Sequence, residues 1–423
     1  MRGDARVDVL PSLDVSQRFA DSPFTIVWIL TNLQLTDSAF IALSATSTVL
    51  KVHGGDISEG KGFVAKVYNV IIEFADQNQP YQVILKVPGT ESFNKALSGT
   101  EVEESSDNNP LKEHHVASLH NSECEFYSKF APHLTLSMPM VFKCQEYVPG
   151  KQPGAILMES LVGKADNSPI YTGATLPQIY KVVDQLVALH AYFLCLPLEE
   201  WTGKYKRHHY DTFAETDFFG PFFEKTRSLK PGVFDAGIEE FTKYKQSVRF
   251  MTYTTCDVYK DIGLPPVLTH GDFCNNNILW KVDSRGHVTN DLAVIIDWQA
   301  IHEGCMTNDL ARFLVISVDG ETRREFENEI LQYYYDSLAQ ALQDKGRNVD
   351  FTYDQIKRAY RANFILHAMV ALAVGPFLLM NKEWSNEERP VKEAQLEKFL
   401  LRARFAVEDA LECLKELPEE KLM

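Results

Sequence analysis

Two short polar segments in the second half of the chain restrict its fold more than any other feature. Residues 269–277 read Thr-His-Gly-Asp-Phe-Cys-Asn-Asn-Asn, and within them Asp272 and Asn277 are five residues apart. Asp297 lies twenty residues after Asn277, at the end of the apolar run 294–296. A carboxylate can accept a hydroxyl proton, while amide and carboxylate oxygens are ligands that Mg²⁺ prefers. A fold that brings these three side chains together is equipped for phosphoryl transfer.

The separation of Asp272 and Asn277 is that of the catalytic loop H-R-D-x-x-x-x-N, in which the Asp takes the substrate hydroxyl proton and the Asn binds a metal ion. We therefore expect Asp272 as the catalytic base, Asn277 and Asp297 as Mg²⁺ ligands, and ATP as the phosphoryl donor. The alternative is an ordinary polar turn, because Gly, Asp and Asn favour turns for backbone reasons alone. A predicted hairpin over residues 281–291, with its turn at 284–286, precedes Asp297 and favours the catalytic interpretation.

The same segments carry a family resemblance. Residues 270–277, 297–299 and 308–311 resemble the choline kinase and aminoglycoside phosphotransferase superfamily, whose members share a protein-kinase-like fold and phosphorylate small-molecule alcohols. Gln299, which follows the predicted metal ligand Asp297, makes the chain resemble most the ecdysteroid kinase-like branch, also called CHK kinase-like, together with three residues far upstream: Glu123, Phe126 and Tyr127. The resemblance implies activity as a small-molecule kinase.

The resemblance also implies an architecture. We expect an α+β, two-lobed protein-kinase-like fold, with a small β-rich N-lobe over residues 1–159 and a larger, mostly helical C-lobe over residues 160–423. In such a fold the backbone just past the last N-lobe strand receives adenine. Glu159 and Leu161 are the candidates for that role by resemblance, because the apolar run 155–159 resembles that strand.

A glycine-rich segment, residues 54–63, is the candidate phosphate-covering loop. Gly60 and Gly62 begin the pattern G-x-G-x-x-A that ends at Ala65, and glycines there allow backbone amides to approach phosphates. Residues 68–74 alternate apolar side chains onto one face and predict the strand that follows. A glycine-rich hairpin turn without a ligand is the alternative for this segment.

The next apolar run, residues 81–88, predicts a second strand, and its Lys86 occupies the place of the Lys in V-A-I-K. A cation there neutralises the α- and β-phosphates when a helical carboxylate holds it. Glu123 is the candidate carboxylate, beside an apolar stripe at helical spacing, and Glu125 is its rival. The alternative for Lys86 is a lysine at the end of a strand whose stem packs while its charge reaches water.

Residues 98–120, between Lys86 and Glu123, are rich in Ser, Glu, Asp, Asn and His. We interpret them as a mobile insertion, because such a composition buries too little apolar surface to offset the entropy of ordering. Three of the residues are histidines: His114, His115 and His120. Without a Cys or a spaced set of carboxylates they are interpreted as solvated side chains rather than as a metal site.

Two differences from protein kinases favour a small acceptor. Gly271 replaces the Arg of H-R-D, which pairs with a phosphorylated activation loop, and Gln299 replaces the Gly of D-F-G. No Ala-Pro-Glu follows to form a peptide-docking segment. The expected acceptor is therefore a small-molecule alcohol, either ecdysteroid-like or sterol-like, or choline-like. A catalytically silent nucleotide- or ligand-binding protein with the same fold is the alternative.

Composition excludes several other classes. The net charge of −16 argues against nucleic-acid binding and against an anionic membrane surface, because both depend on clustered Lys and Arg. The seven cysteines form no C-x-x-C pair, and no targeting segment is convincing, so a reducing, cytoplasmic location is expected. Cys274, inside the catalytic loop, is expected to pack rather than to react, because no base is arranged for it. Nothing in the sequence indicates an oligomeric state.

Helical periodicity dominates the C-terminal half. Apolar positions repeat at helical spacing from about residue 176, and again over residues 324–342, 353–379 and 391–417. His190 continues the first of these faces and is expected to be a hydrogen-bonded core histidine. By the resemblance, Asp309 helps to anchor the catalytic loop.

Overall fold

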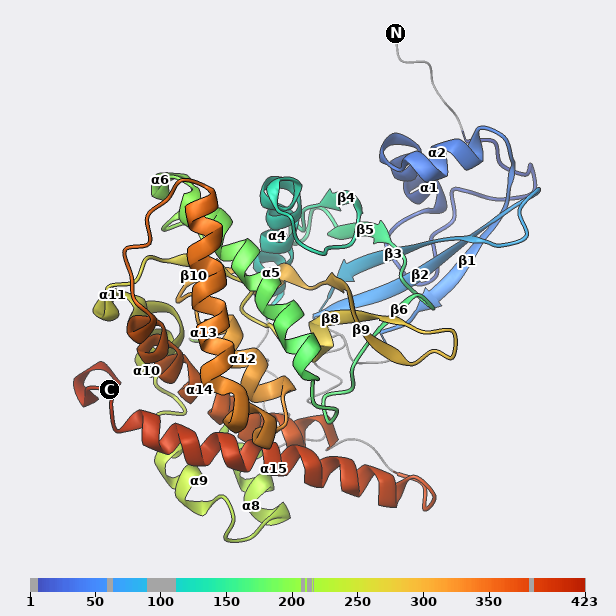
Figure 1. Cartoon of the computed structure of the whole chain (residues 1–423). Coiled ribbons are helices and arrows are strands. Elements are labelled where there is room, and N and C mark those ends of the chain that lie inside the picture. The colour runs from blue at the N-terminus through green and yellow to red at the C-terminus, as the bar shows by residue number, and fades with distance from the viewer. Residues whose placement is uncertain are drawn as a thin grey trace. The chain divides into compact units, whose positions relative to one another are not determined.

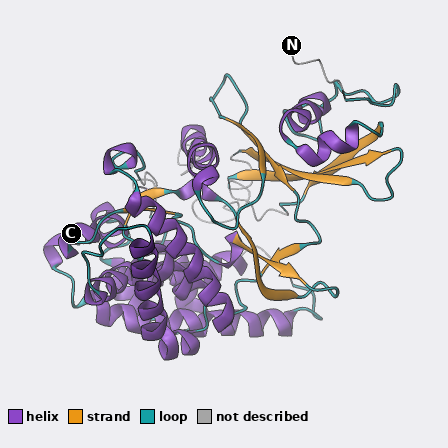
Figure 2. Cartoon of the chain, turned by 45° about the horizontal axis from the view of Figure 1, so that its top comes forward, coloured by secondary structure: helices purple, strands orange, loops and turns teal. Residues whose placement is uncertain are grey.

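The computed structural model of the chain describes residues 7–58, 64–89, 112–206, 210, 215, 217–379 and 384–422 (Figure 1), and of residues 374–379 it describes the backbone alone. The described residues divide into two compact units. The first unit contains residues 7–89, 112–132 and 139–162, and the second contains residues 133–138 and 163–422. Strands predominate in the first unit and helices in the second (Figure 2). The expected α+β, protein-kinase-like fold is therefore confirmed.

A five-stranded antiparallel sheet forms the frame of the first unit, in the order β1-β2-β3-β5-β4. Its strands are β1 (Val49–Asp56), β2 (Ala65–Phe74), β3 (Tyr81–Pro88), β4 (Val141–Gln145) and β5 (Ala155–Glu159). The predicted alternation in β2 is confirmed, because Tyr68, Val70, Ile72 and Phe74 are all buried. The predicted strand over residues 81–88 is β3, and the predicted strand over residues 155–159 is β5.

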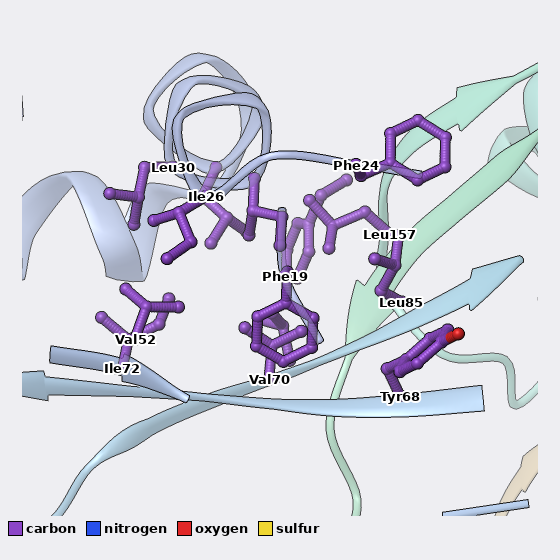
Figure 3. Packing of buried hydrophobic residues seen from close by; sticks show 14 of the residues in the cluster. Phe19, Phe24, Ile26, Leu30, Val52, Tyr68, Val70, Ile72, Leu85 and Leu157 are labelled. Atoms are coloured by element: carbon purple, nitrogen blue, oxygen red, sulfur yellow. The ribbon is translucent and has the colours of Figure 1, made fainter. Parts of the chain in front are cut away.

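Two N-terminal helices cover one face of this sheet. Helix α1 (Ile26–Thr36) and helix α2 (Ser38–Ser44) place apolar side chains over the strands (Figure 3). The buried contacts join Phe19, Ile26 and Leu30 to side chains of β1, β2, β3 and β5. Asp37 separates the helices and caps α2, since its Oδ1 accepts from the amides of Ala39 at 3.0 Å and Phe40 at 3.2 Å. Burial of this apolar surface is the main force that holds the two helices on the sheet.

Among the described residues no single helix is both long and apolar enough to cross a membrane. Helices α1 and α2 reach that length and apolar composition only when they are taken together, and they are bent by 108° relative to each other.

The sequence interpretation of residues 98–120 as a mobile insertion is wrong for its last part. Residues 98–111 lie outside the described residues, but helix α4 (Glu113–Glu125) begins soon after them. Val116 and Leu119 are buried on its inner face, and so is His120, whose Nε2 lies 2.9 Å from the carbonyl oxygen of Gln145. Burial lowers the pKa of His120 to about 4. The polar composition concealed a helix whose few apolar residues are spaced to face the sheet.

The second unit is mainly helical. Its helices are α5 (Leu176–Cys195), α6 (Leu198–Trp201), α8 (Gly220–Leu229), α9 (Asp235–Thr242), α10 (Val248–Thr252), α11 (Val258–Ile262), α12 (Asn308–Ser317), α13 (Gly320–Asp344), α14 (Tyr353–Leu379) and α15 (Arg389–Leu414). The last three confirm the helices predicted from periodicity. Pro390 lies in the first turn of α15, where its missing amide hydrogen leaves no bond unmade.

The core of the second unit contains the predicted buried histidine. His190, on α5, is fully buried, and its Nδ1 lies 2.8 Å from the Tyr334 hydroxyl of α13. Burial lowers the pKa of His190 to about 3, so the ring is neutral at physiological pH. The expected role as a hydrogen-bonded core residue is confirmed.

Two small antiparallel sheets flank the catalytic segments. One pairs β7 (Val267–Thr269) with β10 (His302–Gly304), and the other has the order β6-β8-β9. The strands of the second sheet are β6 (Ala165–Asn167), β8 (Ile278–Val282) and β9 (Val288–Ile295). The predicted hairpin is β8 and β9, and Gly286 in its turn has φ of +80°. This hairpin leads the chain from Asn277 back to Asp297.

Candidate active site

The catalytic loop and the Asp297 loop are tied together by backbone contacts. The loop of residues 270–277 follows β7, and the Asp297 loop leads into β10, the antiparallel partner of β7. Beyond these strands, the amide of Ile296 donates to the carbonyl oxygen of Asn277 at 2.9 Å. The fold therefore places the two predicted metal ligands on adjoining backbone, although they are twenty residues apart in the sequence.

Asp309 anchors the start of the catalytic loop, as expected. Its fully buried carboxylate accepts from the amide of His270 at 2.6 Å and from the amide of Gly271 at 2.9 Å. Hydrogen bonds to a charged group are stronger than neutral ones. Helix α12, which carries Asp309, thus fixes the backbone immediately before Asp272.

His270 positions backbone rather than moving protons. Its Nδ1 accepts from the amide of Asp272 at 3.3 Å, and its Nε2 lies 2.9 Å from the carbonyl oxygen of Ile296. Together these contacts require the neutral ring with its hydrogen on Nε2. The imidazole also packs on Trp298, with 4.6 Å between ring centroids. His270 is therefore a buried brace between the catalytic loop and the Asp297 loop.

Asp272 and Asn277 interact directly. The Asn277 side-chain amide donates to the Asp272 carbonyl oxygen at 2.7 Å and to its Oδ2 at 3.1 Å. These two acceptors fix which end of the Asn277 amide is the NH₂ group. The remaining Oδ1 is the atom able to bind a cation. The Asp272 side chain is 36% exposed.

Asp297 adopts an unusual backbone conformation. Its φ of +68° lies in the left-handed region, which few residues other than glycine adopt and which Asp tolerates better than most. The residue caps the short helical turn Trp298–Ala300, and its Oδ2 accepts from the Gln299 side chain at 3.2 Å. Strained backbone of this kind is found most often at functional sites, where it aims a side chain.

These groups fit a magnesium ion held largely by a nucleotide. Mg²⁺ typically takes one or two protein ligands and completes its octahedral shell with phosphate oxygens and water. Asp297 and Asn277 supply one carboxylate and one amide oxygen. No cluster of three or more His, Cys, Asp or Glu side chains able to hold a metal occurs in the described ranges.

Arg312 is a site residue that the sequence analysis missed. It lies on α12, and its Nη2 donates to Oδ1 of Asp272. The Arg312 side chain is only 15% exposed. In the sequence it stands forty residues from Asp272, inside an apolar helix, with no motif to mark it. The only sequence feature that could have indicated this role is that Arg312 lies three residues, about one helical turn, after Asp309.

Cys274 packs, as expected. The side chain is buried, and burial, followed by the nearby Asp272 carboxylate, raises the pKa of its thiol to about 12. A thiol with so high a pKa forms almost no thiolate at neutral pH, and the thiolate is the nucleophilic form.

In the first unit, Lys86 pairs with Glu123. The Lys86 Nζ lies 2.6 Å from Glu123 Oε2, and the two side chains are 12% and 1% exposed. The rival carboxylate, Glu125, is about half exposed and lies 3.6 Å from Lys129, one helical turn away. The open choice between the two carboxylates is decided in favour of Glu123. The contact of Lys86 with phosphates is a prediction.

The Lys86–Glu123 pair allows a matched test. Glu123→Gln should lower the free energy of unfolding by about 3 kcal/mol and weaken ATP binding, because it leaves the buried ammonium of Lys86 without its counter-charge. Glu125→Gln is the control, and it should change stability by less than about 1 kcal/mol, because its ion pair is exposed. Chemical denaturation and calorimetric titration with ATP measure both quantities. Equal effects of the two substitutions would contradict the assignment.

Four further residues are predicted to contact the nucleotide: Gly60, Gly62, Glu159 and Leu161. Gly60 and Gly62 lie outside the described residues. The Glu159 carboxylate ends β5 and accepts from the amide of Met140 at 2.8 Å. Leu161 is half-buried in the turn that follows. The contact of Glu159 and Leu161 with adenine stays a prediction.

Comparison with known proteins identifies a family. A family model described as "DUF1679: Uncharacterized oxidoreductase dhs-27" matches residues 45–415. The chain belongs to this family. The matched residues include both catalytic segments and the Lys86–Glu123 pair.

Two curated relatives are nematode proteins. The uncharacterized oxidoreductase dhs-27 of Caenorhabditis elegans is 31% identical over 317 residues, which are 73% of this chain but 37% of that protein. An uncharacterized kinase-like protein of the same organism is 27% identical over 103 residues, which are 24% of this chain and 25% of that protein. The chain thus spans well under half the length of either relative.

Similar solved structures are small-molecule kinases. One is choline kinase from Cryptosporidium parvum: the superposition covers 94% of this chain and 97% of the choline kinase chain, at 10% identity and a TM-score of 0.46. An ADP-bound aminoglycoside phosphotransferase covers 87% and 99%, at 14% identity and a TM-score of 0.38. Both come from the superfamily that the motifs resemble.

Proposed function

We propose that this protein is an ATP- and Mg²⁺-dependent phosphotransferase that phosphorylates a hydroxyl of a small-molecule alcohol. One observation carries the proposal: Asp272 lies in hydrogen-bond contact with Asn277, on backbone tied directly to the residue before Asp297. A base and two Mg²⁺ ligands in one place are the parts that phosphoryl transfer requires.

In the proposed reaction Asp272 orients the acceptor hydroxyl and takes its proton as the oxygen bonds to the γ-phosphorus. The bond from the γ-phosphorus to the bridging oxygen breaks, and ADP leaves. Asn277 Oδ1 and the Asp297 carboxylate would hold Mg²⁺, which neutralises phosphate charge when bound. Lys86, fixed by Glu123, would contact phosphate oxygens.

The proposal specifies the chemical class of the acceptor, not one compound. Gly271 occupies the place of the kinase Arg that binds a phosphorylated activation loop, so we propose a small molecule rather than a protein. Ecdysteroid-like or sterol-like alcohols and choline-like alcohols are the proposed classes. The net charge of −16 leaves both classes open, because much of it lies away from the catalytic segments.

The oxidoreductase name belongs to a worm relative of which the matched segment is 37%, and the sheet of this chain does not favour hydride transfer. Folds that bind a dinucleotide for hydride transfer use a mostly parallel sheet with helices on both faces. The five-stranded sheet described above is antiparallel throughout its strand pairs. The phosphotransferase proposal therefore accounts for this chain better than hydride transfer does.

A panel experiment tests the proposal. Purified protein is incubated with Mg·ATP and sterols, choline, ethanolamine or sugars, and ADP and phosphate monoester are measured together. The proposal predicts stoichiometric ADP and monoester with at least one class, and no product when EDTA removes Mg²⁺. Mg²⁺-dependent ATP binding without product across the panel would favour a catalytically silent binding protein instead.

A further inference from the structure

Helix α12 holds the catalytic loop at three places along its length. Asp309 binds the amides of His270 and Gly271, and Ser317 Oγ accepts from the amide of Asn275 at 2.9 Å. Between these anchors, Arg312 binds the Asp272 side chain. Asp309 and Arg312 are three residues apart, and residues at that spacing lie on the same helical face. One face of one helix therefore fixes both the backbone before Asp272 and its carboxylate.

We propose that Arg312 is a positioning residue that holds the Asp272 carboxylate in the orientation needed to receive the acceptor hydroxyl. The inference rests on the proposed phosphotransferase function. Arg312 Nη2 donates to Oδ1, while Asn277 Nδ2 donates to Oδ2 at 3.1 Å. With a donor fixed at each oxygen, the carboxylate cannot rotate about its Cβ–Cγ bond. Carboxylate oxygens accept more than one hydrogen bond, so the acceptor hydroxyl can still bind there.

The burial of Arg312 argues against a purely stabilising role. The Arg312 side chain is only 15% exposed, so its guanidinium has lost most of its hydration, and a buried ion pair is often no more stabilising than apolar side chains of similar volume. Its buried Nε–H has no hydrogen-bond partner within the described part of the chain. Besides Asp272, the ionisable groups close to it include Cys274 and Tyr210. What the guanidinium holds is the proposed base.

The origin of the arginine has a regulatory consequence. Protein kinases place an Arg directly before the catalytic Asp and pair it with a phosphorylated loop. Here Gly271 occupies that place, and the guanidinium beside the Asp comes from α12. Because α12 is a buried helix, Arg312 is in position without any modification. The fold itself therefore supplies the arginine beside the proposed base.

Chemical rescue tests this role. Arg312→Ala should lower kcat by about a hundredfold, the effect of misplacing a reacting group by roughly 1 Å, while the KM for ATP stays within about threefold of wild type. Millimolar guanidinium chloride, far below denaturing concentrations, should restore at least tenfold of the lost kcat by occupying the vacated space beside Asp272. Arg312→Lys keeps the charge but not the planar guanidinium, and its kcat should lie between those of the wild type and Arg312→Ala.

Arg361→Ala is the matched control. Arg361 also forms an arginine–carboxylate pair, with Glu416 at 2.6 and 2.8 Å, but on the exposed surface of α14. Its substitution should leave kcat unchanged, with or without guanidinium. An Arg312→Ala protein with wild-type kcat, or one whose loss guanidinium does not reverse while its melting temperature falls, would overturn the positioning role. Wild-type protein without turnover would instead contradict the proposed function, and the role of Arg312 with it.

Discussion

Asp272→Asn is expected to lower kcat by about 10²- to 10⁴-fold, the range that a positioned general base contributes. The amide has nearly the volume of the carboxylate but cannot take the acceptor proton. ATP binding should change little, because we assign the Mg·nucleotide complex to Asn277 and Asp297. Steady-state kinetics with the acceptor found in the panel, together with calorimetric titration of ATP, measure both quantities.

Asn275 is not a suitable control position, because its side chain is buried within the same loop. Asn276 is exposed, and it is adjacent in the run of three asparagines. Asn276→Ala should retain most of the wild-type kcat, because Asn276 does not have the spacing of a metal ligand. Wild-type turnover by Asp272→Asn would remove Asp272 from the mechanism. A deep loss in Asn276→Ala would show that the loop tolerates no substitution and that the Asp272 result is not specific.

Gly271→Ala is expected to be the most damaging single-methyl change in the catalytic loop. Gly271 has φ of +82°, and a Cβ at this position would lie 2.2 Å from the Ala300 carbonyl oxygen and 2.9 Å from His302 Nδ1. The left-handed conformation costs an alanine roughly 1 kcal/mol, and forcing apart packed backbone costs about 1–3 kcal/mol more. We expect the free energy of unfolding to fall by about 3 kcal/mol and kcat to fall at least tenfold as the loop shifts.

Gly286→Ala separates the two contributions. Gly286 has nearly the same φ, +80°, but nothing lies within 4 Å of the place its Cβ would take. Its substitution should lower the free energy of unfolding by only about 1 kcal/mol, with kcat unchanged. Denaturant titration and kinetics of the two variants provide the comparison. Equal losses in both would show that backbone conformation alone, and not contact with Ala300, makes glycine necessary at position 271.

The same geometry explains why this position cannot carry the kinase arginine. A residue with any side chain at Gly271 would meet Ala300 in the Asp297 loop. The sequence shows that the arginine is missing, but only the fold shows why. The guanidinium that stands beside Asp272 comes from Arg312, on a different element.

Features defined by local spacing were predictable from the sequence. Asp272, Asn277 and Asp297 belong to short segments whose residue types and separations carry their chemistry, and the hairpin between them has a recognisable turn. In the three long C-terminal helices, apolar residues recur at helical spacing because one face of each helix is buried. These signals need no knowledge of which elements lie side by side.

Features that depend on tertiary contact were not predictable. Arg312 looks like a surface charge on a helix until the fold places it against Asp272. Glu123 and Glu125 are two residues apart, and only the rotation of α4 decides which one faces Lys86. The polar segment before Glu123 was interpreted as unstructured, because its composition outweighed the few apolar residues that hold α4 on the sheet.

The most direct test follows the phosphoryl group itself. ATP labelled with ¹⁸O in its γ-phosphoryl group is added with the purified protein to a small-molecule extract of cells, and mass spectrometry records every new ¹⁸O-labelled phosphate monoester. The proposed function predicts at least one labelled alcohol phosphate that requires Mg²⁺ and is absent with Asp272→Asn. Two results would contradict it: label found only in protein or in the inorganic phosphate released by ATP hydrolysis, or the same labelled product formed by the Asp272→Asn variant.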